Sequence, residues 1–165
     1  LRAFEAFGIK QNKSVRSVLV LGVAGGTVIH LVHKLYPKAA VTGVDIDGVM
    51  LDIGRTYFGL GGMERLTLIH QDAKQYVEKA AVQKKTYDLI IVDLFFGREI
   101  PAFVQSTIFL QGLRRMVKTS GIVVINYLRE MEYGTISDKL MRTLQKTFAT
   151  VSDFGIYHNR FFSAG

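Results

Sequence analysis

Residues 17–47 read S-V-L-V-L-G-V-A-G-G-T-V-I-H-L-V-H-K-L-Y-P-K-A-A-V-T-G-V-D-I-D, and this stretch decides the fold. Its first apolar run, Val18 to Leu21, has the continuous hydrophobic character of a strand that is buried on both faces. A glycine cluster follows, then apolar residues at helical spacing as far as Pro37, then a second apolar run that ends in Asp45. The pattern predicts a strand, a tight turn, a crossover helix and a second, parallel strand.

The glycine turn indicates what kind of ligand could lie there. A helix that begins near Gly26 presents free N–H groups and the positive end of its dipole to the turn. The dinucleotide fingerprint would need glycine at Ala24 and Thr27, and the phosphate-binding loop fails at Thr27 and Val28. The remaining G-x-A-x-G pattern favours an adenosyl ligand without phosphates, such as an S-adenosyl compound. A structural turn without a ligand stays open as the alternative.

Three acidic residues follow predicted strands. Asp45 lies about 20 residues after the glycines, the distance at which an acid can accept hydrogen bonds from ribose hydroxyls. Asp72 follows the apolar run 66–69, and Asp93 follows the run 87–92. Ligands of open parallel sheets bind beyond the carboxyl ends of the strands. We therefore expect the three carboxylates to converge on one edge of the sheet.

The rest of the chain alternates between strand and helix patterns. This alternation predicts an α/β fold, a three-layer sandwich with a mostly parallel, doubly wound, Rossmann-like sheet in a single domain over residues 1–165. Residues 160–162 begin a seventh strand that the sequence leaves short, and an open edge there would favour a homodimer. The expected helices are a short one within residues 1–11, one from Gly26 to Pro37, one that Asp47 caps, and three further helices over 73–81, 103–118 and 134–148. The expected later strands cover residues 122–127 and 150–157.

Composition limits the class of protein. The formal net charge is +7, but the basic residues are scattered, so we do not expect a nucleic-acid partner. No apolar run approaches the ~20 residues of a membrane span, and no secretory signal pattern is recognisable, so we expect a cytoplasmic protein without a membrane partner. Cysteine is absent from the sequence, which excludes disulfides, thiolate metal sites and cysteine nucleophiles.

Four blocks of the sequence resemble the spermidine synthase-like branch of the class I S-adenosylmethionine-dependent methyltransferase fold. They are V-L-V-L-G-V-A-G-G-T (18–27), V-T-G-V-D-I-D (41–47), L-T-L-I-H-Q-D-A (66–73) and Y-D-L-I-I-V-D (87–93). The resemblance implies that S-adenosylmethionine, or alternatively its decarboxylated form, is the cofactor. It also implies that Asp45 binds the ribose, that Asp72 and Ala73 contact the adenine, and that Asp93 is the catalytic base or orienting acid.

The resemblance extends to further residues of the same blocks. Ile46 and Val92 would flank the adenosyl group. The cofactor-binding residues implied are Gly22, Val23, Ala24, Gly25, Gly26, Asp45, Ile46, Asp72, Ala73 and Asp93.

The sequence departs from spermidine synthases where those enzymes hold amines. Their first turn carries an acid at the position of Gly25, and their second acid after the fourth strand falls at Phe96. A cationic amine needs carboxylates, and burial of an unpaired ammonium is costly. We also recognise no counterpart of their N-terminal β-rich domain in residues 1–165. These departures remove polyamine-specific features and keep the adenosyl-binding ones.

Several other polar residues are candidates for a role. His30 and His33 lie one turn apart on a predicted helix, but no third ligand is identifiable, so we expect packing rather than a metal site. His70 is expected to be structural, and Asp88 to be a solvated acid at the start of a strand. Substrate contact and strand-end packing are equally open for Asn126, Tyr127 and Arg129.

The sequence thus predicts an S-adenosylmethionine-dependent transferase, with methyl transfer to a small-molecule acceptor as the favoured reaction. The aromatic segment Leu94–Pro101 would cover a pocket as a lid and give an apolar acceptor somewhere to lie. Aminopropyl transfer from the decarboxylated cofactor is the first alternative. A non-catalytic adenosyl-binding scaffold is the second.

Overall fold

A computed structural model describes residues 15–97, 99–128, 134–156 and 158–165. The short helix expected within residues 1–11 and the candidate Arg129 lie outside these ranges. Among the helices that are described, none combines the length and the apolar character needed to cross a bilayer.

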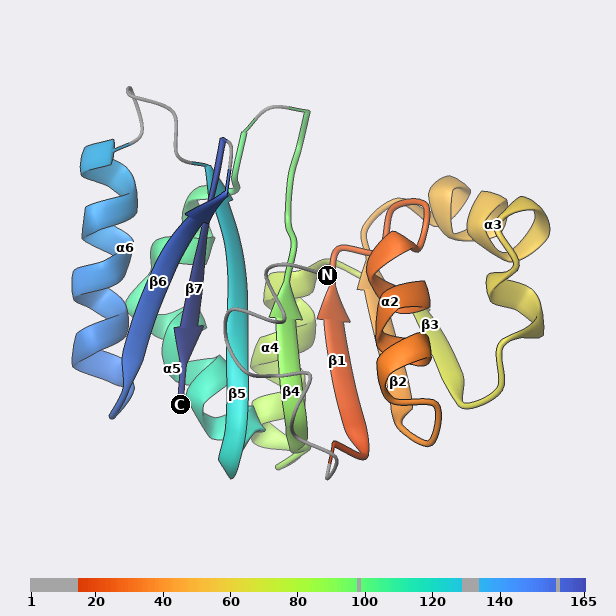
Figure 1. Ribbon diagram of the computed structural model, residues 1–165, viewed down its shortest axis with the longest axis horizontal. Coiled ribbons are helices and arrows are strands. Elements are labelled where there is room, and N and C mark those ends of the chain that lie inside the picture. The colour runs from red at the N-terminus through yellow and green to blue at the C-terminus, as the bar shows by residue number, and fades with distance from the viewer. Residues whose placement is uncertain (1–14, 98, 129–133, 157) are drawn as a thin grey trace.

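A seven-stranded sheet forms the centre of the molecule, in the order β3-β2-β1-β4-β5-β7-β6 (Figure 1). Strands β1 to β5 run parallel to one another, and β7 is antiparallel to both β5 and β6. The predicted α/β class with a mostly parallel sheet is therefore confirmed. The strands are β1 Ser17–Leu21, β2 Ala40–Asp45, β3 Leu66–His70, β4 Tyr87–Val92, β5 Val117–Leu128, β6 Val151–Ile156 and β7 Asn159–Ala164.

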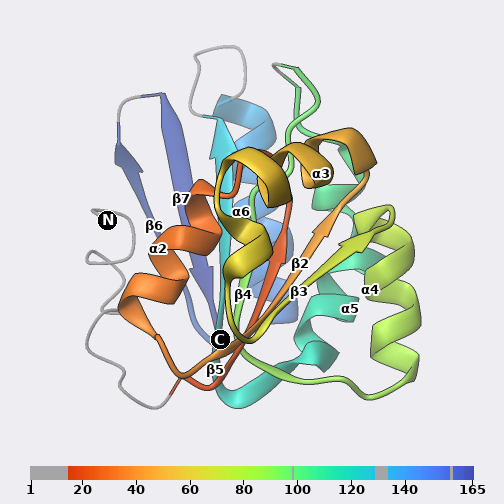
Figure 2. The same cartoon turned by 90° about the vertical axis from the view of Figure 1, so that its right-hand side faces the viewer.

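Helices cover both faces of the sheet, which gives the expected three layers (Figure 2). One face carries α2 (Thr27–Leu35) and α3 (Gly48–Tyr57), and the other carries α4 (Ala73–Val82), α5 (Thr107–Met116) and α6 (Gly134–Thr147). Asp47 caps α3 as expected, since its Oδ1 accepts hydrogen bonds from the amides of Val49 and Met50 at 3.0 Å each.

Strand β1 holds the two layers together because it is buried on both faces. Leu19 and Leu21 pack into the core beneath α4, α5 and α6, while Val18 and Val20 pack into the core beneath α2 and α3. Alternate side chains of a strand point to opposite faces, so a continuous apolar run supplies both cores at once. The run that the sequence singles out is thus the centre of the fold.

Two boundaries differ from the sequence expectation. The helix expected over 103–118 is divided into a 3₁₀ turn, η3 (Ala102–Gln105), and α5. Ser106 separates them because its backbone is extended and its Oγ caps α5 by accepting from the Phe109 amide at 3.3 Å. At the other end, Val117 already has extended angles and begins β5.

The expectation of an incomplete seventh strand is wrong. Strand β7 has six residues and pairs on both sides, with Phe162 opposite Ile125 of β5 and opposite Asp153 of β6. The edges of the sheet are β3 and β6 instead. The open edge that would have favoured a homodimer is therefore closed within the chain.

Asp88 is not the solvated strand-end acid that the sequence suggests. Its side chain is 19% exposed and ties together the starts of three strands. Oδ2 accepts from the amides of Arg16 and Ser17 and from the Ser17 hydroxyl, and Oδ1 accepts from Lys118 Nζ at 2.8 Å. Burial acts to raise the pKa of Asp88, but these hydrogen bonds outweigh it and lower the pKa to about 2.

The low pKa of Asp88 predicts a pH-dependent contribution to stability. Because its pKa is lower in the folded chain than in the unfolded one, the contribution is complete above about pH 4 and is lost as the pH falls towards 2. The shift corresponds to about 2 kcal/mol. In urea denaturation, we expect the stability difference between the wild type and Asp88→Asn to reach about 2 kcal/mol at neutral pH and to shrink over that interval.

Asp52→Asn is the matched control, since Asp52 forms an exposed ion pair with Arg55 and its side chain is 76% exposed. Such pairs contribute little to stability. If the difference in the free energy of unfolding between the wild type and Asp88→Asn stayed constant down to pH 2, the lowered pKa of Asp88 would be contradicted.

Candidate active site

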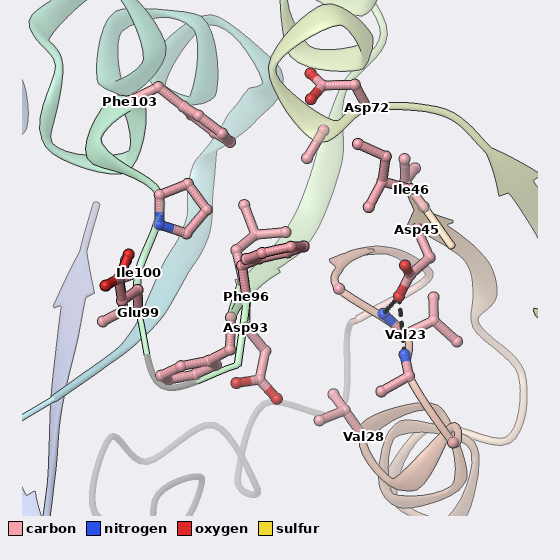
Figure 3. A pocket seen from close by; sticks show the side chains of 18 of the residues that line it. Val23, Val28, Asp45, Ile46, Asp72, Asp93, Phe96, Glu99, Ile100 and Phe103 are labelled. Carbon is pink, nitrogen blue, oxygen red and sulfur yellow. Dashed lines mark hydrogen bonds between the residues drawn. The ribbon is translucent and has the colours of Figure 1, made fainter. Parts of the chain in front are cut away.

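The topology places a cavity at the point where the order of the strands reverses. Strands β1 and β4 lie side by side, while the chain passes from β1 to β2 on one side and from β4 to β5 on the other. Parallel sheets bind ligands beyond the strand ends at such a point. A cavity of about 700 Å³ lies there, bounded by the turn after β1, the end of β2, the start of α4 and the segment after β4 (Figure 3).

The turn after β1 requires glycine at its first position. Gly22 has a φ of +90°, and a Cβ there would lie 2.1 Å from the backbone oxygen of Asp93. Its amide donates to the Val44 carbonyl at 2.9 Å, which fixes the turn against β2. Gly26 closes the turn as the N-cap of α2, with a hydrogen bond from its amide to the Val23 carbonyl at 2.8 Å. The turn therefore sits directly on the ends of β2 and β4.

The carboxylate of Asp45 organises this turn. Its Oδ2 accepts hydrogen bonds from the amides of Val23 at 2.7 Å and Ala24 at 2.9 Å, as the dashed lines in Figure 3 show. Its Oδ1 accepts from the Asp47 amide at 2.9 Å. A carboxylate offers about four acceptor positions. Three are used within the chain, so Asp45 can accept about one further hydrogen bond from a ligand.

The end of β2 and the start of α4 form the wall next to the turn. Ile46 follows Asp45 and is 63% exposed. Asp72 caps α4, and its Oδ1 accepts from the Gln75 amide at 2.9 Å, which leaves Oδ2 for a ligand. Ala73 lies behind it with little exposed surface. This wall combines apolar surface with one available carboxylate oxygen.

Asp93 enters the cavity from the end of β4. Burial raises the pKa of its carboxyl group, and a hydrogen bond from Asn126 Nδ2 to Asp93 Oδ1, at 2.8 Å, acts against that rise. No described residue donates to Oδ2. The site therefore holds a partly buried carboxylate with one oxygen fixed and the other available, which is the arrangement of an acid or base that handles a proton.

The segment after β4 forms the remaining wall, as expected for the aromatic stretch. Phe96 and Glu99 form a tight hairpin through two backbone hydrogen bonds of 2.8 and 3.0 Å, and Phe96 is 81% exposed. In Figure 3 this wall, with Glu99, Ile100 and Phe103, lies across the cavity from Asp45. The aromatic and aliphatic side chains make that half of the cavity largely apolar.

The cavity brings together nine of the ten residues that the sequence implied for the cofactor. Gly26 is the tenth and lies outside the lining, and a Cβ at this position would meet the Leu60 side chain at 2.8 Å. Val92 also lies outside it and is buried in the core. The nine that line the cavity are Gly22, Val23, Ala24, Gly25, Asp45, Ile46, Asp72, Ala73 and Asp93.

Two of the histidines make hydrogen bonds to backbone carbonyls. His30 Nε2 is hydrogen-bonded to the Phe58 carbonyl at 2.7 Å, and His70 Nε2 to the Ile46 carbonyl at 2.9 Å. Within the described part of the chain, no three histidine or acidic side chains are grouped as metal ligands. Tyr127 packs in the core, where its hydroxyl accepts a hydrogen bond from Gln105 Nε2 at 2.6 Å.

Sequence reasoning missed several residues of the cavity wall. Thr27 and Val28 lie on the first turn of α2, and their place could have been found from the predicted start of that helix. Glu99 adds a further carboxylate to the wall, and it stands inside the aromatic segment that the sequence already marks. Phe103 could not have been found, because the sequence pattern placed it in a longer helix.

Comparison with solved structures defines the class of fold. Human methyltransferase-like protein 13, solved in complex with SAH, aligns with 99% of this chain at a TM-score of 0.86 and 22% identity, and the alignment covers 80% of that protein's chain. With its sheet order and its cavity at the point of strand reversal, this chain has the class I methyltransferase fold.

Residues 3–158 of this chain match the family model of the spermine/spermidine synthase domain. The chain therefore belongs to the spermine/spermidine synthase domain family. It is similar to the polyamine aminopropyltransferase of Vibrio vulnificus (29% identity over 119 residues, 72% of this chain and 40% of the relative). It is also similar to the N-terminal histidine N-methyltransferase of Emericella nidulans (31% over 154 residues, 88% of this chain and 25% of the relative). The chain thus spans less than half the length of either relative.

The close contact between Gly22 and the Asp93 backbone predicts how a side chain at position 22 would change the stability of the protein. Gly22→Ala combines an unfavourable φ with a clash against backbone, and we expect it to lower the free energy of unfolding by roughly 2–6 kcal/mol. Gly25→Ala is the matched control, because its Cβ would only reach ordinary contact with the Phe58 ring at 3.5 Å. For Gly25→Ala we expect the free energy of unfolding to change by less than about 0.5 kcal/mol. Equal effects of the two substitutions in urea denaturation would contradict this account of the turn.

Proposed function

We propose that the chain is an S-adenosylmethionine-dependent methyltransferase that acts on a small-molecule acceptor. The observation that carries the proposal is the composition of the cavity. One half is the glycine turn organised by Asp45, and the other half is an apolar wall with Asp93 at its base. The first half suits an adenosyl group without phosphates, and the second suits an acceptor next to it.

The proposed position of the cofactor follows from the donors and acceptors in the first half. The ribose lies at Asp45, where the remaining acceptor position of Oδ1 takes one hydroxyl. The adenine lies between Ile46 and the start of α4, with the Oδ2 of Asp72 within reach of its amino group. The methionine carboxylate lies at the N-terminus of α2, because free N–H groups and the helix dipole favour an anion there.

Two positions favour methyl transfer over aminopropyl transfer. Gly25 adds no negative charge beside α2, so a cofactor carboxylate meets no repulsion from that residue. Phe96 presents an aromatic ring to the cavity where a diamine would need a second carboxylate. A cofactor that retains its carboxylate and an acceptor with little charge both fit these two residues.

The cofactor supplies a methyl group on a positively charged sulfur, so the bond to be broken already has a good leaving group. A nitrogen or oxygen atom of the acceptor forms a bond to the methyl carbon while the carbon–sulfur bond breaks, and the sulfur leaves as a neutral thioether. Asp93 orients the acceptor through Oδ2 and takes the proton that the acceptor loses. The apolar wall aligns the acceptor and excludes water.

Aminopropyl transfer from the decarboxylated cofactor is a second candidate, and Glu99 is the observation that favours it. Glu99 lines the cavity and closes the same hairpin that carries Phe96. It could hold an ammonium group from a position different from that of the missing second acid. One of the matched relatives is itself named a polyamine aminopropyltransferase.

Calorimetric titration with S-adenosylmethionine and with its decarboxylated form tests the proposal. We expect the carboxylated form to bind about 5–30 times more tightly, since an anion at a helix N-terminus contributes about 1–2 kcal/mol in a partly buried site. Gly25→Asp introduces the acid that spermidine synthases carry. Its backbone has no unfavourable φ and a Cβ there meets only the Phe58 ring at ordinary contact distance, so we expect a folded protein whose preference shifts towards the decarboxylated form.

The other outcomes have distinct meanings. A wild-type preference for the decarboxylated form would overturn methyl transfer in favour of aminopropyl transfer through Glu99. Binding of neither form would reject both and leave a scaffold without a cofactor. Tight binding of S-adenosylmethionine with no turnover across a broad panel of amines, phenols and carboxylic acids would favour a non-catalytic adenosyl-binding protein.

A further inference from the structure

Asn126 lies beside the proposed catalytic acid because of the register of the sheet. Strands β4 and β5 pair with Val92 opposite Ile125, so the next residues, Asp93 and Asn126, are neighbours at the carboxyl ends of the strands. Asn126 Nδ2 donates to Asp93 Oδ1 at 2.8 Å. Asn126 does not line the cavity, so it reaches the site only through Asp93.

Asn159 sets the orientation of the Asn126 side chain. It lies on β7, which pairs antiparallel with β5, and its Nδ2 donates to Asn126 Oδ1 at 2.7 Å. An ionised carboxylate only accepts hydrogen bonds, so Asn126 must present its NH₂ group to Asp93. The hydrogen bond from Asn159 requires the same orientation, because it occupies the amide oxygen. A turned amide would place its oxygen against the Asp93 carboxylate and its NH₂ against that of Asn159.

We propose that Asn126 is a positioning residue for Asp93 and that Asn159 acts through it. The two amides form a relay from β7 to β4 that fixes Oδ1 of Asp93 and leaves Oδ2 as the available acceptor in the cavity. The catalytic meaning of the relay rests on the proposed function. The relay itself is a property of the chain that is measurable without any cofactor or acceptor.

The relay gives the C-terminal hairpin a role in the site. Strand β7 lies between β5 and β6, so it brings Asn159 next to β5, although the two asparagines are 33 residues apart in the sequence. Arg160 follows directly and fixes the hairpin against α6, with hydrogen bonds to Ser137 and Asp138 and an ion pair with Asp153. The position of Asn159 is therefore determined by β7 and the contacts of that strand.

Nuclear magnetic resonance of ¹³C-labelled side-chain carboxyl groups tests the relay directly. The pH titration of Asp93 is compared between the wild type, Asn126→Leu, Asn159→Leu and the double variant, and Asp93→Asn assigns the signal. Leucine has nearly the shape of asparagine and no hydrogen-bonding groups. The other acids of the cavity, Asp45, Asp72 and Glu99, are the same in all four proteins, so differences report on the amide contact.

We expect Asn126→Leu to raise the pKa of Asp93 above its wild-type value, because the carboxylate loses its amide donor. Asn159→Leu should cause a smaller rise, since the amide of Asn126 is then free to turn. The double variant should match Asn126→Leu alone, because Asn159 acts only through Asn126. Ser163→Ala, a change elsewhere on β7, should leave the titration unchanged.

An unchanged Asp93 titration in Asn126→Leu would overturn the proposal and leave Asn126 with a packing role. If adding Asn159→Leu to Asn126→Leu shifted the pKa of Asp93 further, Asn159 would not act through Asn126, and this part of the proposal would be overturned. If Asn126→Leu does not fold, Asn159→Leu provides the test, and an unchanged Asp93 titration there would overturn the relay from Asn159.

Calorimetry separates this proposal from the proposed function. We expect S-adenosylmethionine to bind Asn126→Leu within about twofold of the wild type, because the turn organised by Asp45 is unaffected. A wild type that binds no S-adenosylmethionine would reject the proposed function, and the carboxyl titration would still decide whether the relay exists.

Discussion

The site depends on the carboxylate of Asp45, which accepts hydrogen bonds from three backbone amides. The turn after β1 would otherwise leave the amides of Val23 and Ala24 without partners at the edge of a cavity, and unpaired backbone donors are costly when they are withdrawn from water. Because Asp45 ends β2 and the turn follows β1, the contact also holds two neighbouring strands in one geometry. The chain's own hydrogen bonds therefore hold the turn in one conformation, and a ligand that binds there would have less backbone to order.

The opposite half of the cavity is built on different constraints. The end of β4 carries Asp93, and the hairpin after it presents Phe96 and Glu99 to the same space. Gly22 connects the two halves, because its backbone lies against the Asp93 carbonyl with no room for a side chain. The cavity thus has a polar half around Asp45 and a largely apolar half around Asp93, and the proposed function assigns the cofactor to the first and the acceptor to the second.

Much of the fold could be predicted from local sequence. The apolar run 18–21, the glycine turn and the acids after β2, β3 and β4 lie within short stretches, and parallel strands bring their ends together.

What could not be predicted depends on contacts between distant residues. The network of Asp88 joins segments about 70 residues apart. The pairing of β7 on both sides, and the relay from Asn159 to Asp93, arise only when the hairpin inserts next to β5. The role of Asp45 in shaping the turn was also missed, since a ribose ligand explained it equally well.

Amide hydrogen exchange at Val23 and Ala24 in the ligand-free protein tests the central claim most directly. If Asp45 forms the turn in advance, both amides are protected in the wild type, and both exchange much faster in Asp45→Ala, whose side chain has no acceptor for them. Rapid exchange of both amides in the wild type, with protection only after S-adenosylmethionine is added, would contradict the account. The ligand, and not Asp45, would then form the turn.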